Sequence, residues 1–421
     1  MTRVLQHRSA GYIWGVVASL LAVLPAAACS QESIIGASTS LEPTVILISF
    51  DGFRWDYIEM VSTPNFDRLV NSGVRARSLI PSFPTKTFPN HYTIVTGLYP
   101  EHHGIVANTM WDPVFNASYS LGNRDAVQDG RWYGGEPIWV TAENQGQISA
   151  IFFWPGSEAP IQGVRPTHWR IYDGTIPNTA RIDQTLEWLR LPPEERPTFL
   201  AIYFSQPNDV AHEHGAESPE ALAAVSEMDE LVGQLLSGLD ADGVSGDVNI
   251  ILTSDHGMVD LSPDRVFLID DYLDLSTVDI VDMGPVTALI PHDGRETEVY
   301  ESLAGKSSGV TFYWKEEIPQ RLHYSNHRRI TPIVGIADET WTVTTRPRFE
   351  ARGLRAADHG YDPAFLSQHA IFVASGPAFK SGVVVEPFEN VEIYNIMAHV
   401  LGLTAAANDG DLQRVRHVLA D

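Results

Sequence analysis

The sequence predicts an α/β fold with a central, mostly parallel β-sheet flanked by helices, plus a small inserted α+β subdomain. Short apolar runs alternate with longer segments of helical period, which is typical of parallel βαβ construction. The short runs are apolar at nearly every position, as in strands that are buried on both faces. With 421 residues, of which 44% are hydrophobic, the chain can bury a large core.

Five strands are predicted, at residues 45–50, 148–153, 199–204, 248–253 and 370–374. The predicted helices are 64–72, 176–189, 219–239 and 391–401. Asp51, Asp255 and His256 come directly after strands, and Asn208 nearly does. Open α/β sheets place ligand crevices at the carboxyl ends of their strands. We therefore expect these side chains at one edge of the sheet.

The pattern changes between residues 275 and 346. Short β-type segments at 281–291, 310–315 and 341–345 lie close together, with few helical patterns between them. Motifs with metal-ligand character resume only at Asp358. We therefore predict a catalytic domain in two parts, 43–275 and 347–421, separated by an inserted subdomain at 276–346.

The N-terminus has the pattern of an export signal. Basic residues precede an apolar stretch at 13–24, and three alanines follow before Cys29. This pattern predicts a signal peptide at 1–28 and a Ser-, Gly- and Thr-rich tether at 29–42. Cys29, the only cysteine, stands where a bacterial lipobox has its lipid-modified residue. We expect a periplasmic or outer-membrane lipoprotein, with plain secretion or an uncleaved anchor as alternatives.

The charge of the chain limits its partners. A formal net charge of -25 argues against binding along a nucleic-acid duplex, which needs clustered Lys and Arg. A phosphate ester remains compatible, since bound metal ions reverse the local field of a cleft. The expected partner is a small molecule, and the membrane is reached only through an anchor on Cys29.

Oxygen and imidazole ligands recur in distant segments of the chain. They are Asp51; Asn208, Asp209 and His212; Asp255 and His256; and Asp358 and His359. Zinc binds Asp and His readily, and a catalytic zinc keeps one position open for substrate. Two ions about 4 Å apart clamp the attacking and leaving oxygens of an in-line displacement. Strand-ending Asp-Gly pairs are common turns, but independent turns explain the whole set poorly.

Thr87 is the candidate nucleophile. The segment 84–90 reads as a loop that enters a short helix, which places Thr87 at or beside the N-cap. A simple capping role is the alternative. A helix N-terminus favours anions, and zinc would lower the pKa of the hydroxyl. Lys86 is predicted to be a solvated neighbour and His91 a packed helix residue. Asn108 is either a turn residue or a donor to a phosphoryl oxygen.

The motifs resemble those of the nucleotide pyrophosphatase/phosphodiesterase family, within the alkaline phosphatase superfamily. The resemblance rests on the Asp51 strand, Lys-Thr-Phe-Pro-Asn-His around Thr87, Asn108, Thr-Ser-Asp-His-Gly at 253–257 and His-Gly-Tyr-Asp at 359–362. It covers residues 45–403 and implies an alkaline-phosphatase-like sandwich with two zinc ions.

The same resemblance implies a role for each matched residue. Asp51, Thr87, Asp255 and His256 would hold one zinc ion, and His212, His359 and a residue near 208 the other. Thr87 would attack phosphorus and form a phosphothreonine intermediate, with Asn108 on a phosphoryl oxygen. The second zinc ion would then activate water.

One position departs from the family pattern. Asn208 stands where the family has Asp, and the carboxylate follows at Asp209. Either Asn208 ligates through its amide oxygen, or a loop adjustment brings Asp209 in. We expect a site that tolerates this change. The alternative is a catalytically silent surface binding protein.

The resemblance also predicts the substrate class. Phe88 and Tyr172 match positions that hold a nucleotide base between aromatic faces, with core or rim packing as the alternative. The matched motifs contain no arginine for the extra charge of a monoester. We therefore predict hydrolysis of nucleotide-type phosphodiesters or pyrophosphates. A choline-type phosphodiesterase or a phosphomonoesterase of the same superfamily are the alternatives.

Overall fold

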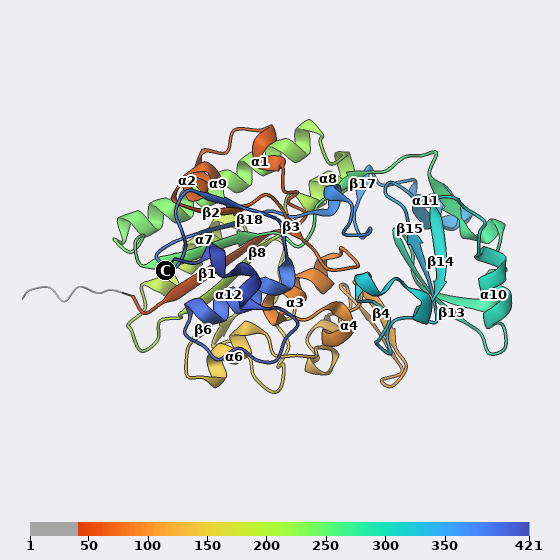
Figure 1. Ribbon diagram of the computed structural model, residues 1–421, viewed down its shortest axis with the longest axis horizontal. Helices are drawn as coiled ribbons and strands as arrows, with labels where there is room; N and C mark the ends of the chain where they lie inside the picture. Colours follow the sequence, from red (N-terminus) through yellow and green to blue (C-terminus); the bar gives the residue numbers. More distant parts are fainter. Residues whose placement is uncertain (1–40, 421) are drawn as a thin grey trace, which may run out of the picture. The chain divides into compact units, whose positions relative to one another are not determined.

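An eight-stranded sheet organises the chain (Figure 1). The structure is a computed structural model that describes residues 41–420, so the predicted signal peptide and Cys29 lie outside the described residues. Across the sheet the strands are β19 (Val383–Val385), β2 (Gly73–Ala76), β18 (Phe372–Ser375), β9 (Val248–Thr253), β1 (Thr44–Phe50), β8 (Phe199–Phe204), β6 (Ser149–Phe152) and β7 (His168–Trp169).

The sheet is mostly parallel, as predicted. β1 lies between β8 and β9 and runs parallel to both, and β6 and β7 continue in the same direction. β18 instead runs antiparallel to β9 and β2, which the βαβ pattern did not predict. The reason is its starting point. The chain enters β18 from His359, whose ring is hydrogen-bonded to Thr85 in the loop before α3. This loop lies at the edge where the parallel strands end, so β18 starts at that edge and runs in the opposite direction.

Alternation along β1 divides the core into two clusters, because successive side chains of a strand point to opposite faces. Val45 and Leu47 belong to the cluster that also contains residues of α3 (Thr87–Thr96), α6 (Ile138–Asn144) and α12 (Ile393–Val400). Ile46 and Ile48 belong to the cluster of α2 (Pro64–Ser72), α7 (Asn178–Leu189) and α9 (Pro219–Ala241). The sheet is therefore the middle layer of an α/β/α sandwich.

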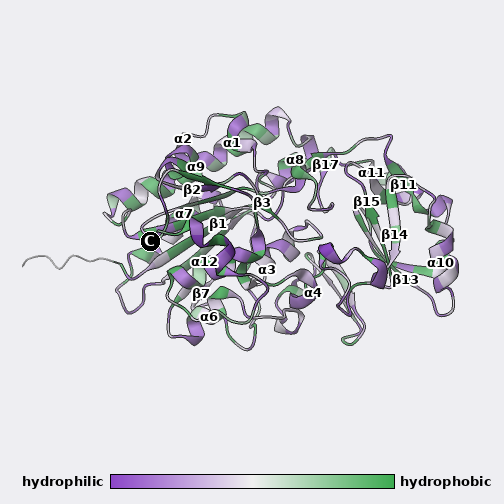
Figure 2. Cartoon of the chain, in the orientation of Figure 1, coloured by the Kyte–Doolittle hydropathy of each residue, from purple (hydrophilic) through white to green (hydrophobic). Residues whose placement is uncertain are grey.

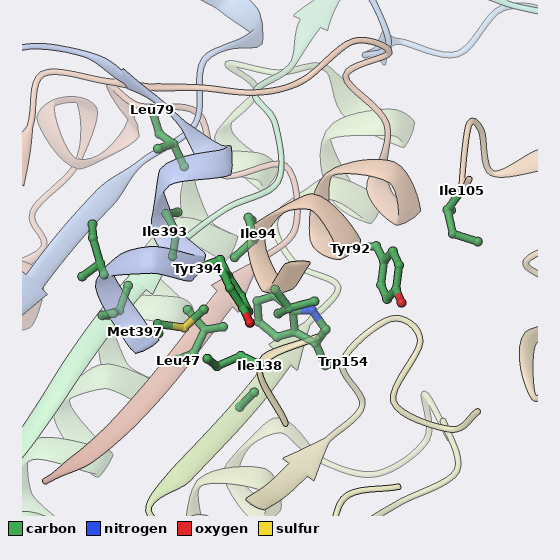
Figure 3. Packing of buried hydrophobic residues seen from close by; sticks show 14 of the residues in the cluster. Leu47, Leu79, Tyr92, Ile94, Ile105, Ile138, Trp154, Ile393, Tyr394 and Met397 are labelled. Carbon is green, nitrogen blue, oxygen red and sulfur yellow. The ribbon is translucent and has the colours of Figure 1, made fainter. Parts of the chain in front are cut away.

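Close packing on the first face is visible around Leu47, Ile94, Tyr394 and Trp154 (Figure 3). The hydropathy colouring shows the same division, with hydrophobic residues along the central strands and mixed colours on the covering helices (Figure 2). The long helix α9 begins with a side-chain cap, in which Ser218 accepts the N–H of Ala221.

A second, four-stranded antiparallel sheet lies within the predicted insertion. Its order is β12 (Val278–Asp282), β13 (Val286–Pro291), β15 (Ile333–Ala337) and β14 (Val310–Trp314), accompanied by α10 (Glu296–Leu303). The segment predicted at 341–345 forms β16 (Thr342–Thr344), which pairs with β11 (Val266–Leu268) outside this sheet. The apolar cluster here extends from Phe267 to Tyr361, beyond the predicted limits on both sides. The boundaries 276 and 346 stay a prediction.

The remaining short elements carry the loops around the sheet edge. The helices are α1 (Tyr57–Met60), α4 (Pro100–His103), α5 (Arg124–Val127), α8 (Asn208–His214), α11 (Arg346–Arg352) and α13 (Leu412–Val415). The strands pair as β3 (Leu79–Ile80) with β20 (Phe388–Glu389), β4 (Thr109–Asp112) with β5 (Ala117–Ser120), and β10 (Val259–Asp260) with β17 (Ala357–Asp358). Among residues 41–420, no helix has the length and apolar character that a membrane span requires.

A buried ion-pair cluster ties the inserted segment to the main core. Asp112 at the end of β4 accepts hydrogen bonds from Arg328 and Arg329, which precede β15. Arg329 also donates to the carbonyls of Gly104 and Trp132, both at 2.6 Å. Burial alone would raise the pKa of Asp112, but the two arginines outweigh it and hold that pKa well below its usual range.

Asp112→Asn is expected to destabilise the protein by about 3 kcal/mol at pH 7, since it leaves Arg329 buried without its partner. A depressed pKa contributes stability above the unfolded value and loses it as pH falls through the folded value. The difference between wild type and variant should therefore shrink below about pH 4. Urea unfolding at pH 7 and pH 3 measures both effects.

Asp240→Asn is the matched control for this experiment. Its pair with Arg68 is exposed on both sides, so we expect a change within about 0.5 kcal/mol. A loss for Asp112→Asn no greater than that of the control would contradict the anchoring role.

Candidate active site

The parallel register of β1 and β9 brings two carboxylates together. Ser49 pairs with Thr253, so Asp51 and Asp255 each lie two residues beyond the last paired position. Gly52, at φ +67°, turns the chain and donates its N–H to Asp255 Oδ1 over 3.1 Å. This φ favours glycine, and a Cβ there would lie 2.9 Å from the Asn208 Cβ. The turn thus fixes both carboxylates at the sheet edge.

Asp51, Asp255 and His256 form the first group of candidate metal ligands. His256 Nε2 lies 3.0 Å from Asp255 Oδ2 and 3.5 Å from Asp51 Oδ1. These three atoms are buried and have no hydrogen-bond partner among the described residues. Tyr203 donates to the other oxygen of Asp51 over 2.7 Å. Each of the three atoms can offer a lone pair to a metal ion, and together they form a buried, unpaired ligand set that fits a bound cation.

His212, Asp358 and His359 form a second group, with one candidate ligand atom from each within 4.8 Å of the others. The rings of His256 and His359 stack at 3.5 Å between centroids, and His212 lies 5.1 Å from His359. The two groups are therefore adjacent, as a dinuclear centre requires. The sequence suggested Asp358 among the possible oxygen ligands, but the family resemblance assigned it to neither zinc ion. Its signal was the Asp-His-Gly triplet, which repeats that of residues 255–257.

The histidines of both groups are oriented by backbone carbonyls. Each donates its Nδ1–H over 2.8 Å, from His212 to Ala357, from His256 to Gly257 and from His359 to Thr85. A carbonyl can only accept, so the Nε2 lone pair of each ring is left for a ligand role. Burial lowers the pKa of His212 and, further, that of His359, which keeps both rings in the neutral form that binds metals.

The carboxylates of the first group are poised for a cation. Burial and the neighbouring Asp255 raise the pKa of Asp51 well above its ordinary value. Burial would also raise the pKa of Asp255, but His256 and His91 outweigh it and lower that pKa. A divalent cation would remove the repulsion between the two acids, so this set of ligand atoms fits a bound divalent metal ion.

Asn208 and Asp209 differ in burial. Asn208 begins α8, is buried, and its Oδ1 has no partner among the described residues. Four residues later on the same helix lies His212, on the same face. Asp209 is exposed and belongs to neither group. Asn208 is therefore the buried member of this pair, and its choice over Asp209 as a metal ligand stays a prediction.

Thr87 is buried at the first position of α3, beside Lys86 at the N-cap, and makes no capping bond. Its loop is tied to both groups: Thr85 accepts from His359, while His91 donates to the Thr87 carbonyl and lies 3.4 Å from Asp255. Asn108 Oδ1 accepts the N–H of Phe88 over 2.9 Å, which leaves its amide hydrogens for another acceptor. The structure thus places the nucleophile candidate and Asn108 together.

Lys86 corrects one prediction, and His91 supports another. Lys86 is buried rather than solvated, because its Nζ forms an ion pair over 2.5 Å with Oδ2 of Asp282, at the end of β12. The sequence could not reveal this partner, which comes from the inserted segment. His91 is packed inside α3 as expected, with Ser49 on its second nitrogen at 2.8 Å.

A cavity of about 690 Å³ opens beside the second group. Its lining includes Lys86, Asn108, Asp282, His359 and, from α11 and the loop that follows, three arginines. Phe88 and Tyr172 do not line it. Tyr172 is 37% exposed and packs edge-on against Phe153 at 5.1 Å, so the structure leaves its predicted base contact untested.

Comparison with known proteins agrees with this geometry. The sequence model of the type I phosphodiesterase / nucleotide pyrophosphatase family matches residues 45–362. The chain belongs to this family. The family resemblance predicted from the sequence is thereby confirmed, and solved structures of family members with TM-scores of 0.86 and 0.87 confirm the fold class. The predicted hydrolase class agrees with the names of the relatives, which are pyrophosphatases and phosphodiesterases.

Individual relatives of this phosphodiesterase-family chain cover most of it. Mouse ectonucleotide pyrophosphatase/phosphodiesterase family member 1 is 41% identical over 90% of the chain, which spans only 43% of that relative's length. Mouse bis(5'-adenosyl)-triphosphatase is 37% identical over 91% of the chain and 83% of its own length.

A solved structure also resembles the chain. It is murine ectonucleotide pyrophosphatase/phosphodiesterase 5, an inactive threonine-to-alanine variant in complex with AMP. It superposes with a TM-score of 0.86 at 37% identity, over 90% of this chain and all of that one.

Proposed function

We propose that this family member is a two-zinc nucleotide pyrophosphatase/phosphodiesterase that cleaves nucleotide-type phosphodiesters or pyrophosphates through a phosphothreonine. The observation that carries the proposal is the pair of adjacent ligand groups beside Thr87, with unpaired donor atoms on Asp51, Asp255 and His256. Relatives named for nucleotide hydrolysis, one of them bound to AMP, support the substrate class.

The residues of the chain have distinct tasks in this reaction. Two bound zinc ions would supply Lewis acidity at the hydroxyl and at the phosphoryl oxygens. Thr87 Oγ1 gives up its proton to solvent and forms a bond to phosphorus, while the bond to the leaving oxygen breaks and that oxygen departs with the bonding electrons. Water then attacks phosphorus and gives one proton to Oγ1 as the bond to Oγ1 breaks, which releases a nucleoside monophosphate and restores the threonine. Asn108 donates its amide hydrogens to a phosphoryl oxygen in both steps.

In this proposal Asp51, Asp255, His256 and Thr87 hold one zinc ion, and Asn208, His212 and His359 the other. The burial of Asn208 beside the site favours it over Asp209. We further propose export of the protein and a lipid anchor on Cys29, from the signal pattern of the sequence. The prefix "ectonucleotide" in the names of relatives agrees with export.

A panel of three chromogenic esters tests the activity: a nucleotide diester, a phosphate monoester and a phosphocholine ester, each with and without a chelator. We expect preferential cleavage of the nucleotide diester and loss of that activity on chelation. Preference for the monoester or the choline ester would replace the proposal by the corresponding alternative. Two bound zinc ions without turnover of any ester would identify a binding protein.

Tyr172→Ala tests the predicted base contact. Stacking on a base contributes about 1–3 kcal/mol, so KM for the nucleotide diester should rise by about fivefold to 150-fold. A chromogenic diester without a base should be cleaved as by the wild type. Steady-state kinetics with both substrates separate these effects.

Tyr272→Ala serves as the control for this variant, since Tyr272 is also an exposed tyrosine and is stacked on Phe267 just before the inserted segment. It should leave both substrates unaffected. Equal losses for the two substrates in Tyr172→Ala would point to rim packing instead of base binding.

A further inference from the structure

The second ligand group has a charge deficit. The first group contains two carboxylates, Asp51 and Asp255. At the second, Asn208 would contribute a neutral amide, and His212 and His359 bind a metal ion as neutral imidazoles. A zinc ion held only by these three residues would receive no negative charge from the protein. Carboxylate charge strengthens binding of a divalent cation, so the deficit predicts a weak site.

Asp358 is the carboxylate of this group. It ends β17, is largely buried, and offers an oxygen within 4.8 Å of ligand atoms of His212 and His359. Asp209, the carboxylate that the sequence suggested, is exposed and outside the group. The backbone at Asp358 is held in place from two sides: β17 pairs with β10, and the His212 ring donates a hydrogen bond to the carbonyl of Ala357. The position of Asp358 beside His212 is therefore set by the backbone.

A cationic group already lies at this position. Arg355 Nη1 is 3.6 Å from Asp358 Oδ1 and 3.3 Å from His212 Nε2. Nδ1 of His212 donates to Ala357, so its Nε2 presents a lone pair toward the guanidinium. Asp358 and His212 thus create a local field that attracts positive charge, while the unpaired Oδ1 of Asn208 lies one helical turn from His212.

We propose that Asp358 is the anionic ligand of the second zinc ion and replaces the charge that is lost at Asn208. The inference rests on the proposed two-metal function. Asp358 Oδ1 also accepts the N–H of His359 over 3.0 Å, which by itself would explain a turn residue. The two roles separate in Asp358→Asn, because the amide keeps the turn acceptor and removes only the charge.

The experiment compares wild type, Asp358→Asn, Asn208→Asp and the double variant. Bound zinc is counted by elemental analysis after dialysis in a zinc buffer, and affinity is measured by competition with a chromogenic chelator. We expect Asp358→Asn to lose one of two zinc ions or to bind the weaker ion at least tenfold less tightly. Asn208→Asp should restore that ion in the double variant. Circular dichroism verifies that each variant is folded.

Asp362→Asn is the matched control. Asp362 lies in the same loop, but its carboxylate is paired with Arg321. This variant should keep both zinc ions at wild-type affinity. Two zinc ions at unchanged affinity in Asp358→Asn overturn the inference, and so does a double variant that stays at one ion.

The experiment distinguishes failure of the inference from failure of the proposed function. If the wild type binds two zinc ions and cleaves the nucleotide diester, and Asp358→Asn binds both ions with wild-type affinity, only the inference about Asp358 is refuted. A wild type that binds fewer than two ions refutes the two-metal proposal and the inference with it.

Discussion

Thr87→Ala is expected to lower kcat for the nucleotide diester by about a thousandfold or more. The reason is that the hydroxyl forms the covalent intermediate, and no other described side chain holds an equivalent place at the start of α3. The variant should remain folded and should keep most of its zinc, because Asp51, Asp255 and His256 stay in place. Steady-state rates, zinc content and thermal unfolding measure the three parts of this expectation.

Two further variants make the result specific. Thr87→Ser retains a hydroxyl and should recover part of the rate, together with a phosphorylated residue that can be trapped by acid quenching. Thr96→Ala removes a buried hydroxyl from the same helix, where it donates to the Tyr92 carbonyl over 2.7 Å. It should cost about 1 kcal/mol of stability and little activity. Undiminished activity of Thr87→Ala would reject the nucleophile assignment.

Metal removal is expected to have the second large effect. Dialysis against a chelator should lower the rate by about a hundredfold or more, and readdition of zinc should restore it. The melting temperature should also fall, since buried Asp51 and Asp255 then repel each other without a cation between them. Rates and thermal unfolding before chelation, after it and after zinc readdition provide the measurement.

Asp255→Asn reproduces this effect at a single residue, because it removes one charged ligand while keeping the acceptor of the Gly52 N–H. Asp229→Asn is its control: Asp229 is equally buried but is satisfied by Asn65 and the N–H of Phe66. The control should lose stability and keep its zinc. Activity that survives both chelation and Asp255→Asn would exclude a metal-dependent reaction at this site.

Much of the sheet could be predicted from local pattern. The strands at 199–204 and 248–253 and the helix at 64–72 have the predicted limits, because continuous apolar runs and a proline at the helix start act within a few residues. The direction of β18 could not be predicted. It depends on where the preceding chain ends in space, and no local pattern encodes that position.

Lys86 shows the same limit at the site. Its sequence neighbours suggest a solvated side chain, but its partner Asp282 is almost two hundred residues away and comes from another sheet. Asp358 is similar, since its significance depends on its distance from His212 of α8, whose Nδ1 is bonded to the neighbouring Ala357 carbonyl.

The sequence by itself determined the family, the fold class and the strand-end residues of the first ligand group. Those features depend on residue type and on order along the chain. The tertiary structure alone decided that Asn208 faces inward while Asp209 is exposed, that Lys86 is neutralised by Asp282, and that Asp358 joins the second group. The physical reason is that burial and electrostatic partnership arise between segments that only folding brings within a few ångströms of each other.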